Sequence, residues 1–142
     1  MAKIDTRAPQ SHLTQWAAQF AVASELCKLR YQVSFTSGNT TPVADIVAIS
    51  QSGQPALIDV KGLYKKNSWI IQRKPRRPNL FYVLVFVPHD RANEFFILSQ
   101  QIANKLINGE LERLGRPKDY PITGIRWEQA ARYKDNWRSL PS

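Results

Sequence analysis

One run of apolar residues, Leu80–Val87, limits the folds open to this chain more than any other feature of the sequence. Branched and aromatic side chains follow one another there without a charged interruption, which is typical of a strand whose two faces are both buried. We therefore expect Phe81–Val87 to form a strand inside a sheet that is covered on both sides. The run is much shorter than the roughly 20 residues that a helix needs to cross a bilayer, so no membrane span is predicted.

The segments around this strand predict an α/β fold. Apolar residues recur at three- and four-residue steps after Ser11, and the face of this first helix expected to be buried consists of Leu13, Trp16, Ala17, Phe20, Ala23, Leu26 and Cys27. The patterns of branched and turn-forming residues predict strands at Tyr31–Phe35, Val43–Ser50, Pro55–Gly62, Glu94–Leu98 and Ile122–Trp127, with a short extended piece at Ser68–Gln72. A second helix is expected from Ser99 to about Leu114, and a last one near Glu128–Leu140.

These elements define an expected order along the chain. We expect a helix, a three-stranded antiparallel meander, a crossover and further strands, closed by C-terminal helices. The crossover follows from Leu63–Leu80, which is long enough to return the chain to a parallel strand.

Size and charge narrow the classes of function. At 142 residues the chain is expected to be one domain, residues 1–142. Its 20 Lys and Arg against 11 Asp and Glu give a net charge of +9, which favours a polyanionic partner. Cys27 is the single cysteine, which excludes an internal disulfide and a multi-cysteine metal site. The N-terminus lacks the apolar stretch of a signal peptide, so we expect a cytoplasmic protein.

Two aspartates are expected to face each other across neighbouring strands. If Gln51–Gly53 form a three-residue hairpin loop, the register sets Asp45 opposite Asp59, with Cβ atoms about 5 Å apart. Period-two alternation puts Lys61 on the same face as Asp59. Two like charges this close need a shared proton or a cation between them. Mg²⁺ binds to one or two carboxylates together with water and phosphate, so the pair predicts a Mg²⁺ or Mn²⁺ site for phosphodiester hydrolysis. The alternative is two solvated aspartates that Lys61 balances.

The stretch from Asp45-Ile-Val to Asp59-Val60-Lys61-Gly62 resembles the PD-(D/E)xK signature of restriction-endonuclease-like nucleases. The flanking helix and strands and the closing segment 125–137 resemble small bacterial and phage members, so the likeness covers most of the chain. It implies a restriction-endonuclease-like core in which Asp45, Asp59 and the Val60 carbonyl bind the metal and Lys61 is the catalytic lysine. Gln72 falls near the position at which related nucleases often carry a supporting glutamine.

The first helix departs from this pattern. Many relatives carry a glutamate there that reaches the metal site, whereas Gln19 stands at the best-aligned position. Glu25 lies about 240° around the helix from Gln19, so it cannot take the same place without rotation of the helix. The alternative role of Glu25 is a surface charge near Lys28. A missing acidic ligand implies weaker metal binding, one metal in place of two, or an inactive enzyme.

A basic segment follows the predicted metal site. No acidic residue lies between Lys61 and Arg77, and Lys and Arg bind phosphates without regard to sequence. The residues expected to contact nucleic acid are Lys65, Lys66, Trp69, Arg73, Lys74, Arg76 and Arg77, with Trp69 stacking on bases. The alternative is a solvated loop whose Trp69 and Ile71 are tucked into the core.

Together these features predict a Mg²⁺- or Mn²⁺-dependent DNA endonuclease, with branched or invading DNA as one candidate substrate. The sequence leaves two alternatives open. One is a nucleic-acid-binding module that kept the fold and lost turnover, and the other is a subunit that needs a protein partner. Because cutting both strands of a duplex needs two active sites, a homodimer is a further expectation.

Overall fold

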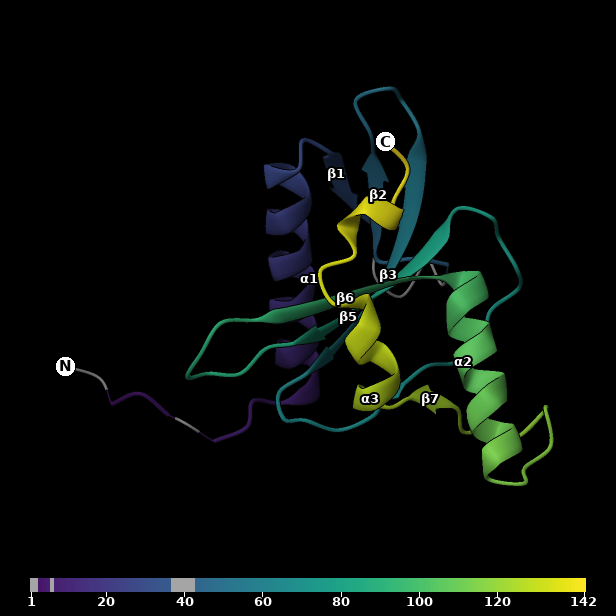
Figure 1. The fold of residues 1–142 in the computed structure, drawn as a ribbon. Helices are drawn as coiled ribbons and strands as arrows, with labels where there is room; N and C mark the ends of the chain where they lie inside the picture. The colour runs from purple at the N-terminus through teal and green to yellow at the C-terminus, as the bar shows by residue number, and fades with distance from the viewer. Residues whose placement is uncertain (1–2, 6, 37–42) are drawn as a thin grey trace.

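The structure, a computed structural model, describes residues 3–5, 7–36 and 43–142 (Figure 1). Its helices are α1 (Ser11–Lys28), α2 (Gln100–Arg113) and the short α3 (Trp127–Ala130), followed by 3-10 helices at Ala131–Tyr133 and Trp137–Ser139. Its strands are β1 (Gln32–Phe35), β2 (Ile46–Ile49), β3 (Pro55–Leu63), β4 (Trp69–Ile70), β5 (Leu80–Phe86), β6 (Glu94–Ser99) and β7 (Gly124–Ile125). None of the described helices is both long and apolar enough to cross a membrane.

Five strands form one mixed sheet in the order β1-β2-β3-β5-β6, and β4 pairs with β7 in a separate two-stranded ribbon. Strands β1, β2 and β3 form an antiparallel meander, β5 runs parallel to β3, and β6 runs antiparallel to β5. The expected meander and crossover are therefore confirmed. The crossover contains the short strand β4 in place of the helix that usually makes such a connection.

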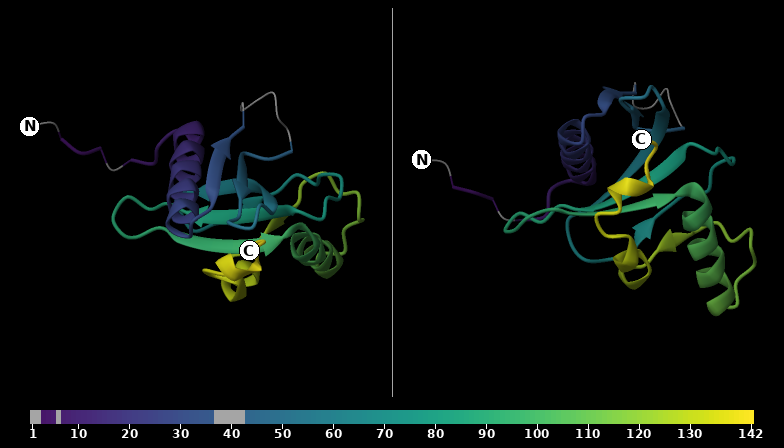
Figure 2. Two further views of the ribbon diagram at one scale, coloured as in Figure 1. Left: turned by 90° about the horizontal axis from the view of Figure 1, so that it is seen from above. Right: turned by 45° about the horizontal axis from the view of Figure 1, so that its top comes forward.

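Each face of the sheet has its own apolar core, which explains the unbroken apolar run of β5. Every residue of β5 is buried. Phe81, Val83 and Val85 pack in the core that α1 covers, whereas Tyr82 and Leu84 pack in the core that α2, β4 and β7 cover. Figure 2 shows α1 on one side of the sheet and α2 with α3 on the other. The predicted strand buried on both faces is confirmed.

Helix α1 packs on the sheet through small and aliphatic side chains and not through its aromatic ones. Its buried residues are Thr14, Ala18, Val22 and Leu26. The predicted buried face was wrong for five residues that are exposed: Leu13, Trp16, Ala17, Phe20 and Cys27. The reason is the close approach of the helix to β3, because a Cβ atom on Gly62 would lie 2.8 Å from the Cβ atom of Ala18. Only a row of small residues fits there, and the aromatic rings pack against each other outside the core.

The C-terminal residues do not form the single helix expected near 128–140. The helical path ends at Tyr133, because the backbone of Lys134 is extended and Asp135 has a φ of +54°. Asp135 donates its backbone N–H to the Phe95 carbonyl oxygen (2.9 Å), and Lys134 forms a β-bridge with Phe96. The C-terminal segment therefore covers the free edge of β6, which is otherwise open to pairing with another chain.

Candidate metal and nucleic-acid site

Strand β3 extends beyond the first residue of its antiparallel neighbour β2. The last part of β3 therefore has no strand partner on the edge that faces β2. The pairing of β2 with β3 ends at Ile46 and Ile58, whereas β3 continues to Leu63. On the open edge, Val60 and Gly62 present backbone groups that need hydrogen-bond partners. Two side chains supply these partners, one from the residue before β2 and one from α1.

Asp45 lies directly before β2 and turns its side chain toward β3. Its carboxylate oxygen Oδ2 accepts a hydrogen bond from the Val60 N–H (2.8 Å). Burial raises the pKa of Asp45 above its ordinary value and the charge of Asp59 adds to the rise, whereas the Val60 hydrogen bond and two nearby lysines oppose it. Asp45 is therefore a half-buried carboxylate that is held in one orientation and lies within electrostatic reach of Asp59.

Gln15 of α1 completes the open edge of β3. Its Nε2 donates a hydrogen bond to the Val60 carbonyl oxygen (2.6 Å), and its Oε1 accepts one from the Gly62 N–H (3.2 Å). Both groups of its amide are thus used on backbone atoms of one strand. Because the Val60 N–H also donates to Asp45, two side chains hold the backbone of Val60, one at its N–H and one at its carbonyl.

The structure corrects the assignment made for the first helix. The residue of α1 that reaches the site is Gln15, and not Gln19, which lies one turn further along and has no hydrogen-bond partner among the described residues. Glu25 forms an ion pair with Lys28 (2.6 Å), which is the surface role that the sequence left open. Sequence reasoning missed Gln15 because it took the aromatic side of α1 for the buried one. The row of small residues beside Gln15 was the signal that pointed to it.

Asp59, on β3, is a buried carboxylate that two lysines compensate. Its side chain is 1% exposed, and its Oδ1 lies 3.2 Å from the Lys61 Nζ. Its Oδ2 lies 2.5 Å from the Lys74 Nζ. Asp59 and Lys61 therefore share a face, as predicted, and the β2–β3 register continues to the predicted position of Asp45 opposite Asp59. The alternative of two solvated aspartates is wrong for Asp59.

The contact between Asp59 and Lys74 is an ion pair without hydrogen-bond geometry. Within the described ranges, Asp59 Oδ2 is the one buried side-chain oxygen or nitrogen that makes no hydrogen bond. A buried carboxylate oxygen in this state is compensated by the charge of Lys74 and accepts no hydrogen bond from the described residues. Tyr82 pairs with Asp59 across β3 and β5 and adds no negative charge beside it, because burial and the charge of Asp59 raise the pKa of Tyr82 to about 12.

Lys74 comes from the crossover and lies in the site rather than on the outer surface. Its Nζ also donates to the Val43 carbonyl oxygen (3.0 Å). The backbone around it is held by the buried side chain of Gln100, the first residue of α2. Gln100 Nε2 donates to the carbonyl oxygens of Lys74 and Pro75 (3.1 Å each), and its Oε1 accepts the Arg77 N–H (2.7 Å).

A cavity of about 370 Å³ opens beside Lys74. Gln72, Arg73 and Arg77 line it, together with Val43 and Leu80. The Arg73 guanidinium also donates a hydrogen bond to the Asn108 side chain of α2 (2.5 Å). Gln72, Arg73, Arg76 and Arg77 are all exposed. Lys74 thus contacts Asp59, and Gln72, Arg73 and Arg77 share a cavity with Lys74.

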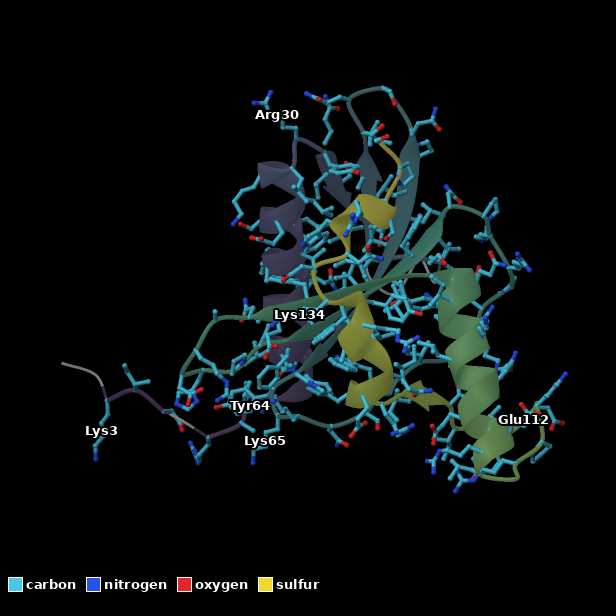
Figure 3. All side chains as sticks on the ribbon, viewed as in Figure 1. Lys3, Arg30, Tyr64, Lys65, Glu112 and Lys134 are labelled. Atoms are coloured by element: carbon cyan, nitrogen blue, oxygen red, sulfur yellow. The ribbon has the colours of Figure 1, made fainter. Side chains whose placement is uncertain are left out.

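Lys65 and Lys66 lie elsewhere, beyond the far end of β3. Lys65 is the sixth residue after Asp59, which corresponds to about 20 Å along an extended chain. Both lysines line a second cavity, of about 420 Å³, with Tyr64 and His89. Figure 3 shows Tyr64 and Lys65 at the lower end of the molecule. The basic segment is thus divided between two places and does not form one surface beside the acidic pair.

Trp69 is not a surface residue, which corrects its assignment as a base-stacking contact. Its side chain is 1% exposed. The indole Nε1 donates to the Val85 carbonyl oxygen (3.2 Å), and the ring stacks on Trp127 with 5.1 Å between centroids. Ile71 is equally buried. The alternative, in which both side chains belong to the core, is confirmed.

The oxygen atoms around Asp59 suit a hard divalent cation. The candidate ligands are the carboxylates of Asp45 and Asp59 and the carbonyl of Val60, and Mg²⁺ in proteins takes one or two carboxylates and completes its shell with water and phosphate. Asp59 Oδ2, which makes no hydrogen bond and is paired with the Lys74 ammonium, is the structural observation that fits a cation at this place. The described part of the chain has no cluster of three or more His, Cys, Asp and Glu that would bind a metal.

Comparison with solved structures finds the same fold in a bacterial homing endonuclease, I-Ssp6803I. The two chains are 15% identical with a TM-score of 0.60, and the match covers 92% of this chain and 93% of that chain. No family model and no curated protein sequence matches the chain. The chain has an endonuclease-like α/β fold. At this level of identity the likeness concerns the fold and not the residues of the site.

Proposed function

We propose that this chain is a divalent-metal-dependent nuclease of the PD-(D/E)xK type that hydrolyses phosphodiester bonds in DNA. The observation that carries the proposal is the meeting of Asp45, Asp59 and Lys61 where β3 extends beyond β2. Asp59 is buried, and its carboxylate lies 3.2 Å from the Lys61 Nζ. Asp45 accepts a hydrogen bond from the backbone of Val60, the residue between Asp59 and Lys61 in the chain. The shared fold with an endonuclease supports the same proposal.

Each residue of the site has a role in this proposal. Asp45, Asp59 and the Val60 carbonyl would hold Mg²⁺ or Mn²⁺, which polarises a phosphate and lowers the pKa of a bound water. The Lys61 side chain is 32% exposed, so its ammonium reaches solvent, where it orients the attacking water and stabilises negative charge on the phosphate. Gln15 holds the Val60 carbonyl in place. It is therefore a positioning residue and does not touch substrate.

The cavity beside Lys74 is the proposed binding surface for the DNA backbone. Arg73 and Arg77 on its wall supply positive charge, and Gln72 supplies an amide that can donate to phosphate or water. Arg76 is exposed and precedes Arg77 in the chain, and it is proposed to extend this surface. Lys65 and Lys66 are proposed to bind phosphates at the far end of β3. Binding through phosphate contacts of this kind weakens as the salt concentration rises.

Cleavage assays test the proposal. The protein is incubated with linear duplex, single-stranded and branched DNA in Mg²⁺, Mn²⁺ or EDTA, beside Asp59→Asn and Lys61→Met. Asp59→Asn removes the charge and keeps the shape, and Lys61→Met keeps the apolar stem. Lys105→Met, which removes an exposed lysine from α2, is the matched control. We expect metal-dependent cleavage by the wild type and the control, and about 100-fold slower cleavage by the two site variants.

The same assay separates the alternatives. Metal-dependent cleavage that persists at full rate in both site variants refutes the proposed site. A second candidate function, a DNA-binding module without turnover, is favoured by Gln15, because a neutral amide stands where a third carboxylate would strengthen metal binding. Salt-sensitive DNA binding without cleavage in any metal supports that module. Absence of affinity for DNA and RNA at low salt supports a subunit that acts through a protein partner.

A further inference from the structure

Lys74 takes the place beside Asp59 that a divalent cation would need. Its Nζ lies 2.5 Å from Asp59 Oδ2 and 3.0 Å from the Val43 carbonyl oxygen. Mg²⁺ binds a carboxylate oxygen at about 2.1 Å. An ion bound to Oδ2 would therefore overlap the ammonium group and repel it. The metal ion and Lys74 cannot use this oxygen at the same time.

The side chain of Lys74 can leave Asp59 without a movement of its backbone. Gln100 is 2% exposed and binds the backbone from the Lys74 carbonyl to the Arg77 N–H, so this part of the crossover is anchored to α2. The lysine side chain is a flexible four-carbon stem. It is 22% exposed and borders the cavity of about 370 Å³. Rotation of the stem would carry the ammonium from Asp59 into this cavity.

A phosphate in the cavity would provide the counter-charge that Lys74 gives up. Arg73 and Arg77 line the same cavity, so an anion bound there would meet two guanidinium groups and attract a third positive charge. Departure of Lys74 would leave the buried Asp59 with Lys61 as its single ion-pair partner among the described residues. A buried carboxylate with less compensation attracts another cation more strongly.

We propose that Lys74 is a tethered cation that competes with the metal ion for Asp59, and that DNA phosphate in the cavity beside Lys74 relieves this competition. The inference rests on the proposed function and adds its regulation: the metal binds tightly when DNA is bound. Thermodynamic linkage requires that DNA raise the affinity for the metal by the same factor by which the metal raises the affinity for DNA. Lys74 then has a role distinct from that of the exposed arginines.

Metal-binding measurements test this role independently of cleavage. Free Mn²⁺ is followed by electron paramagnetic resonance for the wild type, Lys74→Met and Lys74→Arg, with Lys105→Met on α2 as the control for loss of one positive charge. Without DNA, we expect Lys74→Met to bind Mn²⁺ about tenfold more tightly than the wild type. Lys74→Arg keeps a cation beside Asp59 and stays close to the wild type, as does Lys105→Met.

The second arm adds a short phosphorothioate duplex, with protein-free duplex as the blank. We expect the duplex to raise the Mn²⁺ affinity of the wild type about tenfold and that of Lys74→Met by much less. Equal Mn²⁺ affinities of the wild type and Lys74→Met without DNA overturn the inference, and the nuclease proposal stands if cleavage persists. Absence of Mn²⁺ binding in every protein, with and without DNA, refutes the metal site and the proposed function together.

A third measurement uses the wild type alone, for the case in which Lys74→Met does not fold. Nitrogen-15 spectra of the lysine ammonium groups and carbon-13 spectra of the side-chain carboxylates are recorded while Mg²⁺ is added in the presence of the phosphorothioate duplex. We expect the Lys74 signal to shift as its ion pair with Asp59 breaks. A Lys74 signal that keeps its position while the Asp59 carboxylate signal responds to Mg²⁺ overturns the inference.

Discussion

The carboxylate of Asp45 accepts the backbone N–H of Val60 at 2.8 Å, and this contact fixes Asp45 on the edge that β2 leaves open. Burial is the largest cause of the raised pKa of Asp45. A carboxyl group whose pKa is higher in the folded state than in the unfolded state stabilises the fold at pH values below its unfolded pKa, where it is protonated. This contribution is lost as the pH rises through the folded pKa. At neutral pH the ionised Asp45 therefore lowers the free energy of unfolding.

We predict that Asp45→Asn, without metal, is more stable than the wild type near neutral pH. Asparagine keeps an oxygen that accepts the Val60 N–H and removes the charge that is costly to bury. The difference disappears at acidic pH, below the ordinary range of an aspartate, because Asp45 is then neutral in both states. Urea unfolding at the two pH values measures this, and a variant that is less stable than the wild type near neutral pH contradicts the prediction.

Gln15→Glu is predicted to lower the stability of the metal-free protein and to raise its affinity for the metal ion. Without metal, a carboxylate oxygen replaces the Nε2 donor and faces the Val60 carbonyl oxygen, so we expect a loss of about 1–3 kcal/mol in urea unfolding. Mn²⁺ is expected to recover this loss and to bind more tightly than to the wild type, because the site gains a third carboxylate. Gln19→Glu, one turn away on α1, is the matched control and should change neither quantity. Equal Mn²⁺ affinity of the two variants would count against the position assigned to Gln15.

Gly62→Ala is predicted to destabilise the fold by about 1–3 kcal/mol through overpacking. The new Cβ atom would lie 2.8 Å from the Ala18 Cβ atom and 3.1 Å from the Thr14 carbonyl oxygen. Gly109→Ala on α2 is the control, since a Cβ atom there has nothing within 4 Å and alanine favours a helix by about 0.5–1 kcal/mol. Thermal unfolding of the two variants should therefore shift in opposite directions. Ala18→Gly in the Gly62→Ala background should recover part of the loss, and no recovery would show that the helix contact is not the cause.

Gln100→Ala is predicted to release the crossover from α2. The substitution removes three hydrogen bonds to the backbone of Lys74, Pro75 and Arg77. We expect faster hydrogen exchange of the Arg77 amide, with α1 unchanged, and a loss of about 1–3 kcal/mol in urea unfolding. Gln101→Ala, at the exposed neighbouring position, is the control. Unchanged protection of Arg77 would contradict the anchoring role of Gln100.

Much of the fold follows from local patterns in the sequence. The apolar run predicted β5 with both faces buried, because continuous hydrophobicity is incompatible with a face in water. The loop at Gln51–Gly53 fixed the register of β2 and β3, and the register predicted the opposition of Asp45 and Asp59. The shared face of Asp59 and Lys61 depends on the alternation of one strand alone. These relationships lie within one element or between two adjacent ones, so the sequence suffices for them.

The rest depends on contacts between distant elements. Which side of α1 is buried depends on the close approach at Gly62, and hydrophobicity alone favoured Trp16 and Phe20 instead. Lys74 was predicted as one of several phosphate contacts. Its place beside Asp59 depends on the hydrogen bond from Gln100 to its backbone, and the crossover sequence contains no pattern that predicts this contact. The burial of Trp69 likewise depends on the pairing of β4 with β7. This pairing cannot be predicted from the sequences of two such short strands.

A crystal grown in saturating Mn²⁺, with anomalous diffraction recorded to locate the ion, tests the central claim most directly. The account predicts an anomalous peak within bonding distance of Asp59 Oδ2 and a carboxylate oxygen of Asp45, with the Lys74 ammonium displaced toward the cavity that Arg73 and Arg77 line. Mn²⁺ bound at another place, with Asp59 still paired to Lys74, would contradict it.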